Sequence, residues 1–79
     1  MTHTVKTTVD AKGLICPEPV MMLHTAVRDA EPGDVIKVEA TDPTTKRDIQ
    51  QFCDFLGHAL LELDESDELL LFYIQKAGA

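Results

Sequence analysis

The sequence alternates between segments with the periodicity of a strand and segments with the periodicity of a helix. This alternation limits the folds open to the chain more than any other feature. Turn signals that contain glycine or proline separate the segments. They are Lys12-Gly13, Glu31-Pro32-Gly33-Asp34, Thr41-Asp42-Pro43 and Leu56-Gly57. The segments between them follow the order β-α-β-α-β-β, which is typical of a sheet covered by helices.

Four segments are predicted as strands. Residues 5–9 alternate with period two, and residues 35–40 place Ile36, Val38 and Ala40 on one face. Two further strands are predicted at residues 59–64 and 69–76, joined by the acidic turn Glu65-Ser66-Asp67. The last strand is apolar on both faces, so it either has a covered outer face or occupies a central place in the sheet.

Two segments are predicted as amphipathic helices, residues 17–30 and residues 43–56. In each, apolar residues recur at intervals of three and four, as on one face of a helix. The stripe of the first helix is Val20, Leu23, Val27 and Ala30. The stripe of the second helix is Ile49, Phe52, Cys53 and Leu56.

We therefore predict a single domain over residues 1–79 with an α/β (α+β) two-layer sandwich fold. Right-handed crossovers place both helices on one face of a mixed four-stranded sheet. A chain of 79 residues buries only about 60% of its unfolded surface, so the core is thin. A thin core disfavours a self-sufficient enzyme with an enclosed substrate pocket.

The chain is acidic, with 7 Lys and Arg against 14 Asp and Glu and a net charge of −7. Such a charge disfavours direct, stable binding to nucleic acid, which depends on Lys and Arg neutralising phosphates. It fits basic or mixed-charge protein partners, or simply a need for solubility. No apolar run reaches the ~20 residues of a membrane helix, and the N-terminus lacks the plan of a signal peptide. A cytoplasmic protein is the expectation.

Cys16 is the candidate reactive residue. A residue before proline is driven toward extended values, and Pro17 suits the first position of a helix. We therefore expect Cys16 at the N-cap, where the helix dipole lowers the pKa of a thiol. Pro19 lacks an N–H, which leaves the backbone N–H groups of Glu18 and Val20 as donors near the sulfur. The loop containing Gly13 keeps the thiol near the surface.

The absence of certain residues near Cys16 also limits the chemistry that it can perform. No second cysteine follows at C-x-x-C spacing, and no His or Asp is adjacent in sequence as a general base. An exposed thiol without catalytic apparatus suits a carrier that receives a group from one protein and gives it to another. Three alternatives remain: a cysteine that only caps a helix, a thiol-based redox-sensing or regulatory binding module, and a structural adaptor.

At this point the sequence resembles the TusA/SirA family of sulfur carriers, most closely its TusA branch. Residues 10–22, with the motif Cys16-Pro17-Glu18-Pro19, resemble the family's signature. Residues 42–49, followed by Phe52-Cys53, resemble its second block, and the ending Tyr73-Ile74-Gln75-Lys76 also fits. The chain departs from the family at Ile15, His24 and Thr25, where relatives commonly carry basic residues.

The resemblance implies that Cys16 accepts sulfur as a persulfide from a cysteine desulfurase, a PLP enzyme. A downstream sulfur-relay protein then takes the sulfur. The relay ends in 2-thiolation of the wobble uridine of certain tRNAs. The chain itself is expected to hold no cofactor. Gly13, Pro17, Glu18 and Pro19 are the supporting motif of the site.

Further residues are candidates for partner binding because they lie away from the predicted core stripes. They are Met21, His24, Arg28, Arg47 and Phe55. Cys53 shares a stripe with apolar residues, so we interpret it as a packing residue. The spacings of His3, His24 and His58 relative to the cysteines match no zinc pattern, so no metal site is expected.

Overall fold

The computed structural model describes residues 4–78 and contains the expected elements in the expected order. The strands are β1 (Val5–Ala11), β2 (Val35–Ala40), β3 (Ala59–Ser66) and β4 (Leu69–Gln75). The helices are α1 (Glu18–Asp29) and α2 (Thr45–Leu56).

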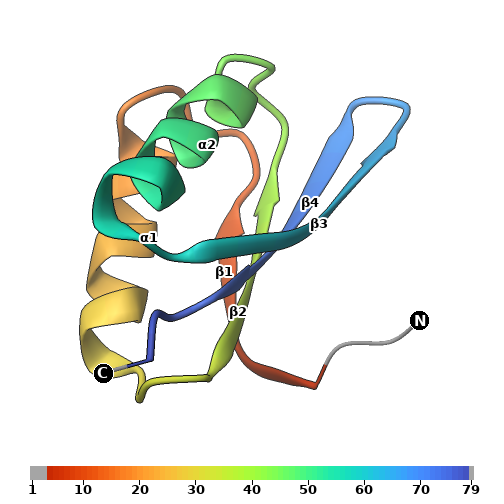
Figure 1. Ribbon diagram of the computed structural model, residues 1–79. Helices are drawn as coiled ribbons and strands as arrows, with labels where there is room; N and C mark the ends of the chain where they lie inside the picture. Colours follow the sequence, from red (N-terminus) through yellow and green to blue (C-terminus); the bar gives the residue numbers. More distant parts are fainter. Residues whose placement is uncertain (1–3, 79) are drawn as a thin grey trace.

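The strands form one mixed sheet in the order β1-β2-β4-β3. Strand β1 is parallel to β2, and β4 is antiparallel to both of its neighbours. Both helices lie on the same side of the sheet, as Figure 1 shows. The predicted two-layer sandwich with a mixed four-stranded sheet is confirmed.

Strand β4 is apolar on both faces because it lies in the interior of the sheet, between β2 and β3. The sequence allowed either a covered outer face or a central strand, and the central position is confirmed. Its buried side chains, on the face toward the helices, are Leu70, Phe72 and Ile74. Its half-buried side chains, on the opposite face, are Leu69, Leu71, Tyr73 and Gln75.

The helices contribute to the core as their stripes predicted, except at their ends. Leu56 is 41% exposed, so its assignment to the buried stripe was wrong. The helix ends beside it at Gly57, which has a left-handed φ of 80° and donates its N–H to the Cys53 carbonyl at 2.8 Å. Glycine adopts this conformation without the steric cost that a Cβ brings. The fully buried Pro19 adds to the core of α1, a contribution that the sequence reading did not include.

Helix α2 begins two residues later than predicted, and Asp42 explains the difference. Its Oδ1 accepts a hydrogen bond from the Thr44 N–H at 3.0 Å, which closes a turn before the helix. Side chains of this type compete with helical hydrogen bonds and favour such turns. Residues 43 and 44 therefore belong to the connection between β2 and α2.

Thr45, the first residue of α2, gives a prediction about stability. It is fully buried, and its Oγ1 has no hydrogen-bond partner among residues 4–78. An unsatisfied buried polar group costs about 1–3 kcal/mol. We expect Thr45→Val, which keeps the shape, to raise the free energy of unfolding in urea by about 1 kcal/mol. Thr44→Val, at an exposed neighbouring position, is the control; a loss of stability in Thr45→Val alone would show that the hydroxyl is satisfied.

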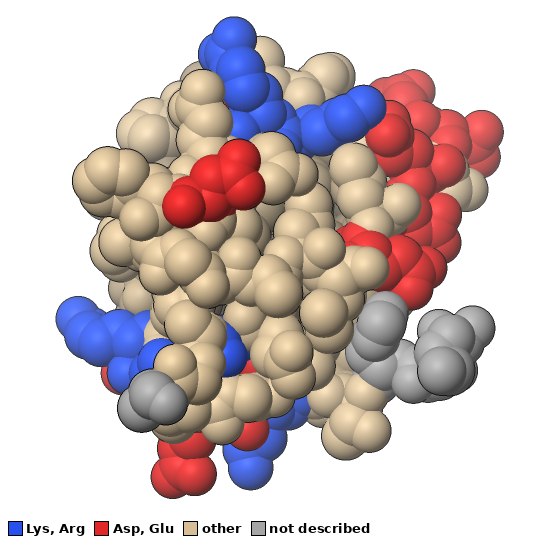
Figure 2. Space-filling model, viewed as in Figure 1, with Lys and Arg blue, Asp and Glu red and all other residues tan. Residues whose placement is uncertain are grey.

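The negative charge of the chain is concentrated on the β3–β4 hairpin. The exposed acidic residues of this hairpin are Glu62, Asp64, Glu65, Asp67 and Glu68. Figure 2 shows acidic side chains gathered on one side of the molecule, where the hairpin lies in Figure 1. Within residues 4–78, no helix is long and apolar enough to cross a membrane.

Candidate functional site

Cys16 lies at the edge of the sheet where two parallel strands end. The last residues of β1 and β2, Ala11 and Ala40, are paired, so the segments that follow them leave the sheet side by side. Crevices outside the carboxyl ends of such strands are common binding positions in α/β folds. The cysteine is exposed there, which confirms that the approach loop keeps it at the surface.

The loop that carries Cys16 is held by the segment that follows β2. The Gly13 N–H donates to Thr41 Oγ1 at 2.9 Å, and the Cys16 N–H donates to Asp42 Oδ2 at 3.1 Å. Lys12 Nζ also donates to Glu39 Oε1, in β2 itself, at 2.8 Å. Gly13 has a φ of 82°, which explains its place in the supporting motif. These contacts fix the backbone of the cysteine.

The predicted N-cap position of Cys16 was wrong by one residue. Pro17 precedes the first helical residue, Glu18, and the helix has no side-chain cap. The peptide bond between Cys16 and Pro17 is cis. The Glu18 N–H was expected to be a donor near the sulfur. It donates instead to the Ile15 carbonyl at 3.0 Å.

A carboxylate that was not predicted from the sequence lies against the sulfur. The Cys16 thiol donates a hydrogen bond to Asp48 Oδ2. Asp48 comes from the first turn of α2, and its other oxygen, Oδ1, is 3.9 Å from Arg47 Nε. No Asp is next to Cys16 in the sequence, but the fold brings Asp48 into contact with it.

These neighbours raise the pKa of the Cys16 thiol above its ordinary value. The hydrogen bond to Asp48 is the largest cause, followed by partial desolvation and by the negative charges of Asp48 and Asp42. The guanidinium of Arg47 acts in the opposite direction and does not offset them. The prediction of a lowered pKa was therefore wrong. A helix dipole acts only within the first turn, whereas the carboxylate is in direct contact.

A shallow hollow of about 390 Å³ surrounds the sulfur, between α1 and α2. Its lining residues are Cys16, Pro17, Val20, His24, Asp48, Gln51 and Phe52. It is open to solvent, so a partner can approach the thiol directly. Its size and openness agree with a site that presents a group to another protein.

The predicted partner-binding residues are all exposed, but they are not equally close to Cys16. His24 lines the same hollow and packs edge-on against Phe52, with ring centroids 5.0 Å apart. Arg47 lies beside Asp48, which also lines the hollow. Arg28 is in the last turn of α1, where its Nε lies 3.5 Å from Asp29 Oδ1.

The apolar members of the predicted partner-binding surface are both well exposed. Met21 projects from α1, and Phe55 projects from α2 with 88% of its surface exposed. Ile15 and Met22 are also exposed, although they were not among the residues predicted from the sequence. Large apolar side chains gathered at a surface are typical of binding sites.

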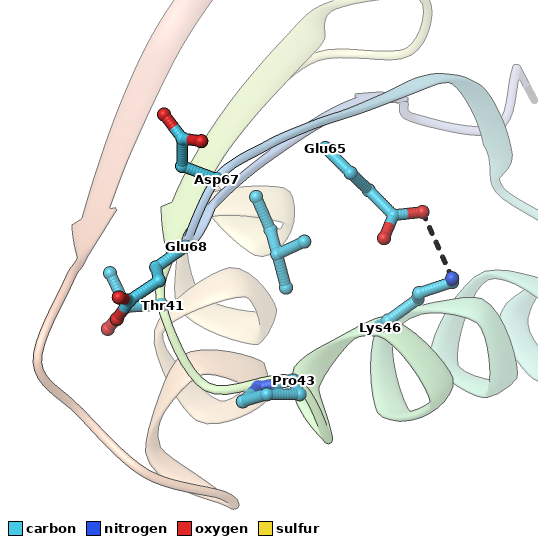
Figure 3. A pocket seen from close by; sticks show the side chains of 7 residues that line it. Thr41, Pro43, Lys46, Glu65, Asp67 and Glu68 are labelled. Carbon is cyan, nitrogen blue, oxygen red and sulfur yellow. Dashed lines mark hydrogen bonds and ion pairs between the residues drawn. The ribbon is translucent and has the colours of Figure 1, made fainter.

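A second cavity of about 390 Å³ lies between the acidic hairpin and the start of α2 (Figure 3). Lys46 Nζ pairs with Glu65 Oε2 across it at 3.0 Å. Its lining residues are Thr41, Pro43, Lys46, Glu65, Asp67, Glu68 and Leu70, none of which is a ready nucleophile. This cavity contains no thiol, so Cys16 in the first hollow remains the candidate reactive residue.

Cys53 is 1% exposed, which confirms its interpretation as a packing residue. Burial raises the pKa of its thiol to about 11, so it is almost entirely protonated at neutral pH. His24 and His58 both lie against Phe52, and His3 is outside the described residues. Among residues 4–78, no group of three or more His, Cys, Asp or Glu side chains could hold a metal ion.

The fold and the site together define a class of protein: a small two-layer domain that presents one exposed cysteine two residues before its first helix. Comparison with known proteins narrows the class to a family. Residues 7–76 match the family described as Sulfurtransferase TusA, and the chain belongs to this family.

Individual relatives agree with this assignment over nearly the whole chain. The chain is 58% identical over 76 residues to the sulfur carrier protein TusA of Pseudomonas aeruginosa, which covers 96% of both chains. It is 57% identical over 68 residues to the protein of the same name from Pseudomonas putida, covering 86% of this chain and 85% of the relative. The crystal structure of a SirA-like protein from Desulfitobacterium hafniense superimposes with a TM-score of 0.80 at 26% identity, covering 90% of this chain and 97% of that one.

Proposed function

We propose that the protein is a cytoplasmic sulfur carrier that accepts a sulfane sulfur on Cys16 and gives it to a downstream protein. The observation that carries the proposal is the exposed thiol before α1 in a chain of the TusA family. The donor is a cysteine desulfurase, whose PLP belongs to that enzyme. The acceptor is a sulfur-relay protein, and the final product is 2-thiolated wobble uridine in tRNA.

The transfer needs no oxidant or reductant. The Cys16 sulfur attacks the terminal sulfur of the donor persulfide, so that a bond from Sγ to this sulfur forms. The sulfur–sulfur bond of the donor breaks, and its electron pair leaves on the donor thiolate. The proton of the Cys16 thiol passes to the solvent or to this thiolate. Delivery to an acceptor thiol repeats the same exchange, with Cys16 as the leaving group.

The geometry of the site disfavours the main alternative, a redox sensor. Sensor cysteines are typically low-pKa thiols placed beside a second cysteine that resolves the oxidised form. The pKa of Cys16 is raised, and Cys53 is buried in the core. An oxidised Cys16 would therefore have no exposed partner thiol within the chain to resolve it.

The charge of the chain supports partners that are proteins and not tRNA. The exposed acidic hairpin would repel phosphates, whereas it would attract a basic protein surface. In this proposal the carrier reaches the tRNA pathway through the relay protein and makes no stable contact with nucleic acid.

Mass spectrometry of the intact chain and of its peptides tests the proposal. After incubation with a cysteine desulfurase and cysteine, we expect the chain to gain one sulfur, located on the Cys16 peptide and removable by dithiothreitol. Addition of a relay protein should then transfer the sulfur to it. A chain that gains no sulfur from its cognate desulfurase, or gains it on Cys53, would contradict the proposal.

A further inference from the structure

We propose that the Asp48 carboxylate lowers the affinity of Cys16 for sulfur by stabilising the sulfur-free cysteine as a hydrogen-bonded thiol. The inference rests on the sulfur-carrier function proposed above and assigns to Asp48 a role in that reaction. A carrier has to release its cargo, so a residue that favours the empty form would favour delivery.

The contact between Asp48 and Cys16 joins two parts of the chain that are each held in place. Asp48 precedes the fully buried Ile49 in α2, which anchors the first turn of the helix in the core. The Asp48 side chain is only 17% exposed. The Cys16 backbone is held from the other side by its hydrogen bond to Asp42 Oδ2. The fold therefore holds both residues so that the carboxylate lies next to the sulfur.

Loading with sulfur removes the hydrogen bond that the empty site makes. In the thiol, the Sγ–H donates to Asp48 Oδ2. In the persulfide, Sγ is bonded to a second sulfur and carries no proton, so this donor is lost. A carboxylate that loses its donor in a partly buried place loses stabilisation, and hydrogen bonds to charged groups are among the stronger ones.

The charges around the sulfur act in the same direction on an ionised persulfide. The carboxylate of Asp48 on α2 and that of Asp42 in the preceding connection both repel a negative sulfur. Arg47 on α2 attracts it, and His24 on α1 faces the same hollow. The charge of each carboxylate acts on the Cys16 sulfur more strongly than that of Arg47, so the two carboxylates dominate the local field. The exchange between Cys16 and a donor thiol is thereby shifted toward the empty carrier.

The test compares wild type with Asp48→Asn, which keeps the side-chain shape and removes the charge. Each protein is equilibrated with a small persulfide and its parent thiol, glutathione persulfide and glutathione, and the loaded fraction of Cys16 is measured by mass spectrometry. We expect the equilibrium constant for loading to rise several-fold in Asp48→Asn. We also expect Cys16 to react with iodoacetamide several-fold faster at neutral pH, with the pH profile displaced to lower pH.

Two further variants sharpen the comparison. Asp48→Ala removes the charge without introducing an amide and should behave like Asp48→Asn. Asp54→Asn removes one charge from the same helix at a carboxylate that accepts a hydrogen bond from Gln50 at 3.0 Å, and it should change neither measurement. Circular dichroism checks that each variant is folded.

The outcomes separate this inference from the proposed function. Equal loading of wild type and both Asp48 variants, with sulfur on Cys16 in all of them, would overturn the role of Asp48 and leave the carrier function standing. No loading of any variant, with a displaced iodoacetamide profile, would refute the carrier function and with it this role, although the contact with the thiol would be real. Increased loading in Asp54→Asn as well would show a general effect of net charge, which also contradicts the proposal.

Discussion

Cys16→Ser is expected to abolish sulfur uptake from a desulfurase and to abolish delivery in cells. A serine hydroxyl is not an effective nucleophile at neutral pH, and it cannot form a persulfide. The substitution is nearly the same in shape at an exposed position, so the fold should be retained. Mass spectrometry after incubation with desulfurase and cysteine measures the uptake. The 2-thiouridine content of tRNA in a strain that depends on this chain measures the delivery.

Cys53→Ala is the matched control, because it removes the other thiol of the chain. Cys53 is buried and does not reach the surface, so uptake should remain close to that of wild type with a modest loss of stability. If Cys16→Ser keeps full delivery in cells, the protein acts as a structural adaptor instead. If Cys53→Ala loses uptake while it remains folded, the assignment of the two cysteines is wrong.

The fold could be predicted from the sequence because its determinants are local and repeated. The alternation in residues 35–40 and the helical spacing of Ile49, Phe52 and Cys53 each point to one buried face, and both were confirmed. The ends of elements were less predictable, since they depend on single contacts. The turn closed by Asp42 and the left-handed Gly57 decide where α2 begins and ends.

The identity of the reactive residue could be predicted, but its electrostatic environment could not. Cys16 stood out because of its neighbours in sequence, whereas Asp48 meets it only through the fold. One signal was available: in a β-α-β unit the segments after two parallel strands leave the same edge of the sheet. Asp42 and Asp48 follow β2 and could have been placed near Cys16 on that ground. The sign of the pKa shift still required the side-chain contact itself.

Substitution of two phenylalanines gives the second prediction with a large expected effect. Phe72 lies in the core, whereas Phe55 lies at the surface. Phe72 is fully buried in the central strand β4, and Phe72→Ala is expected to cost about 3–5 kcal/mol of stability. Small domains have a total stability of about 5–15 kcal/mol, so this loss would remove a large part of it and, at the lower end of the range, leave the chain partly unfolded. Urea denaturation followed by circular dichroism measures it.

Phe55→Ala should leave the stability of the fold almost unchanged and should instead affect the reaction with a partner. With 88% of its surface exposed, Phe55 contributes little to the core, and the free energy of unfolding should change by less than about 0.5 kcal/mol. If it contacts the desulfurase, loading by the enzyme should slow by about tenfold, because an aromatic contact in an interface is commonly worth more than 1 kcal/mol. Loading by glutathione persulfide should not change, since no docking is involved. A variant with normal enzymatic loading would remove Phe55 from the partner-binding surface, whereas one that slows both reactions would place its effect on Cys16 itself.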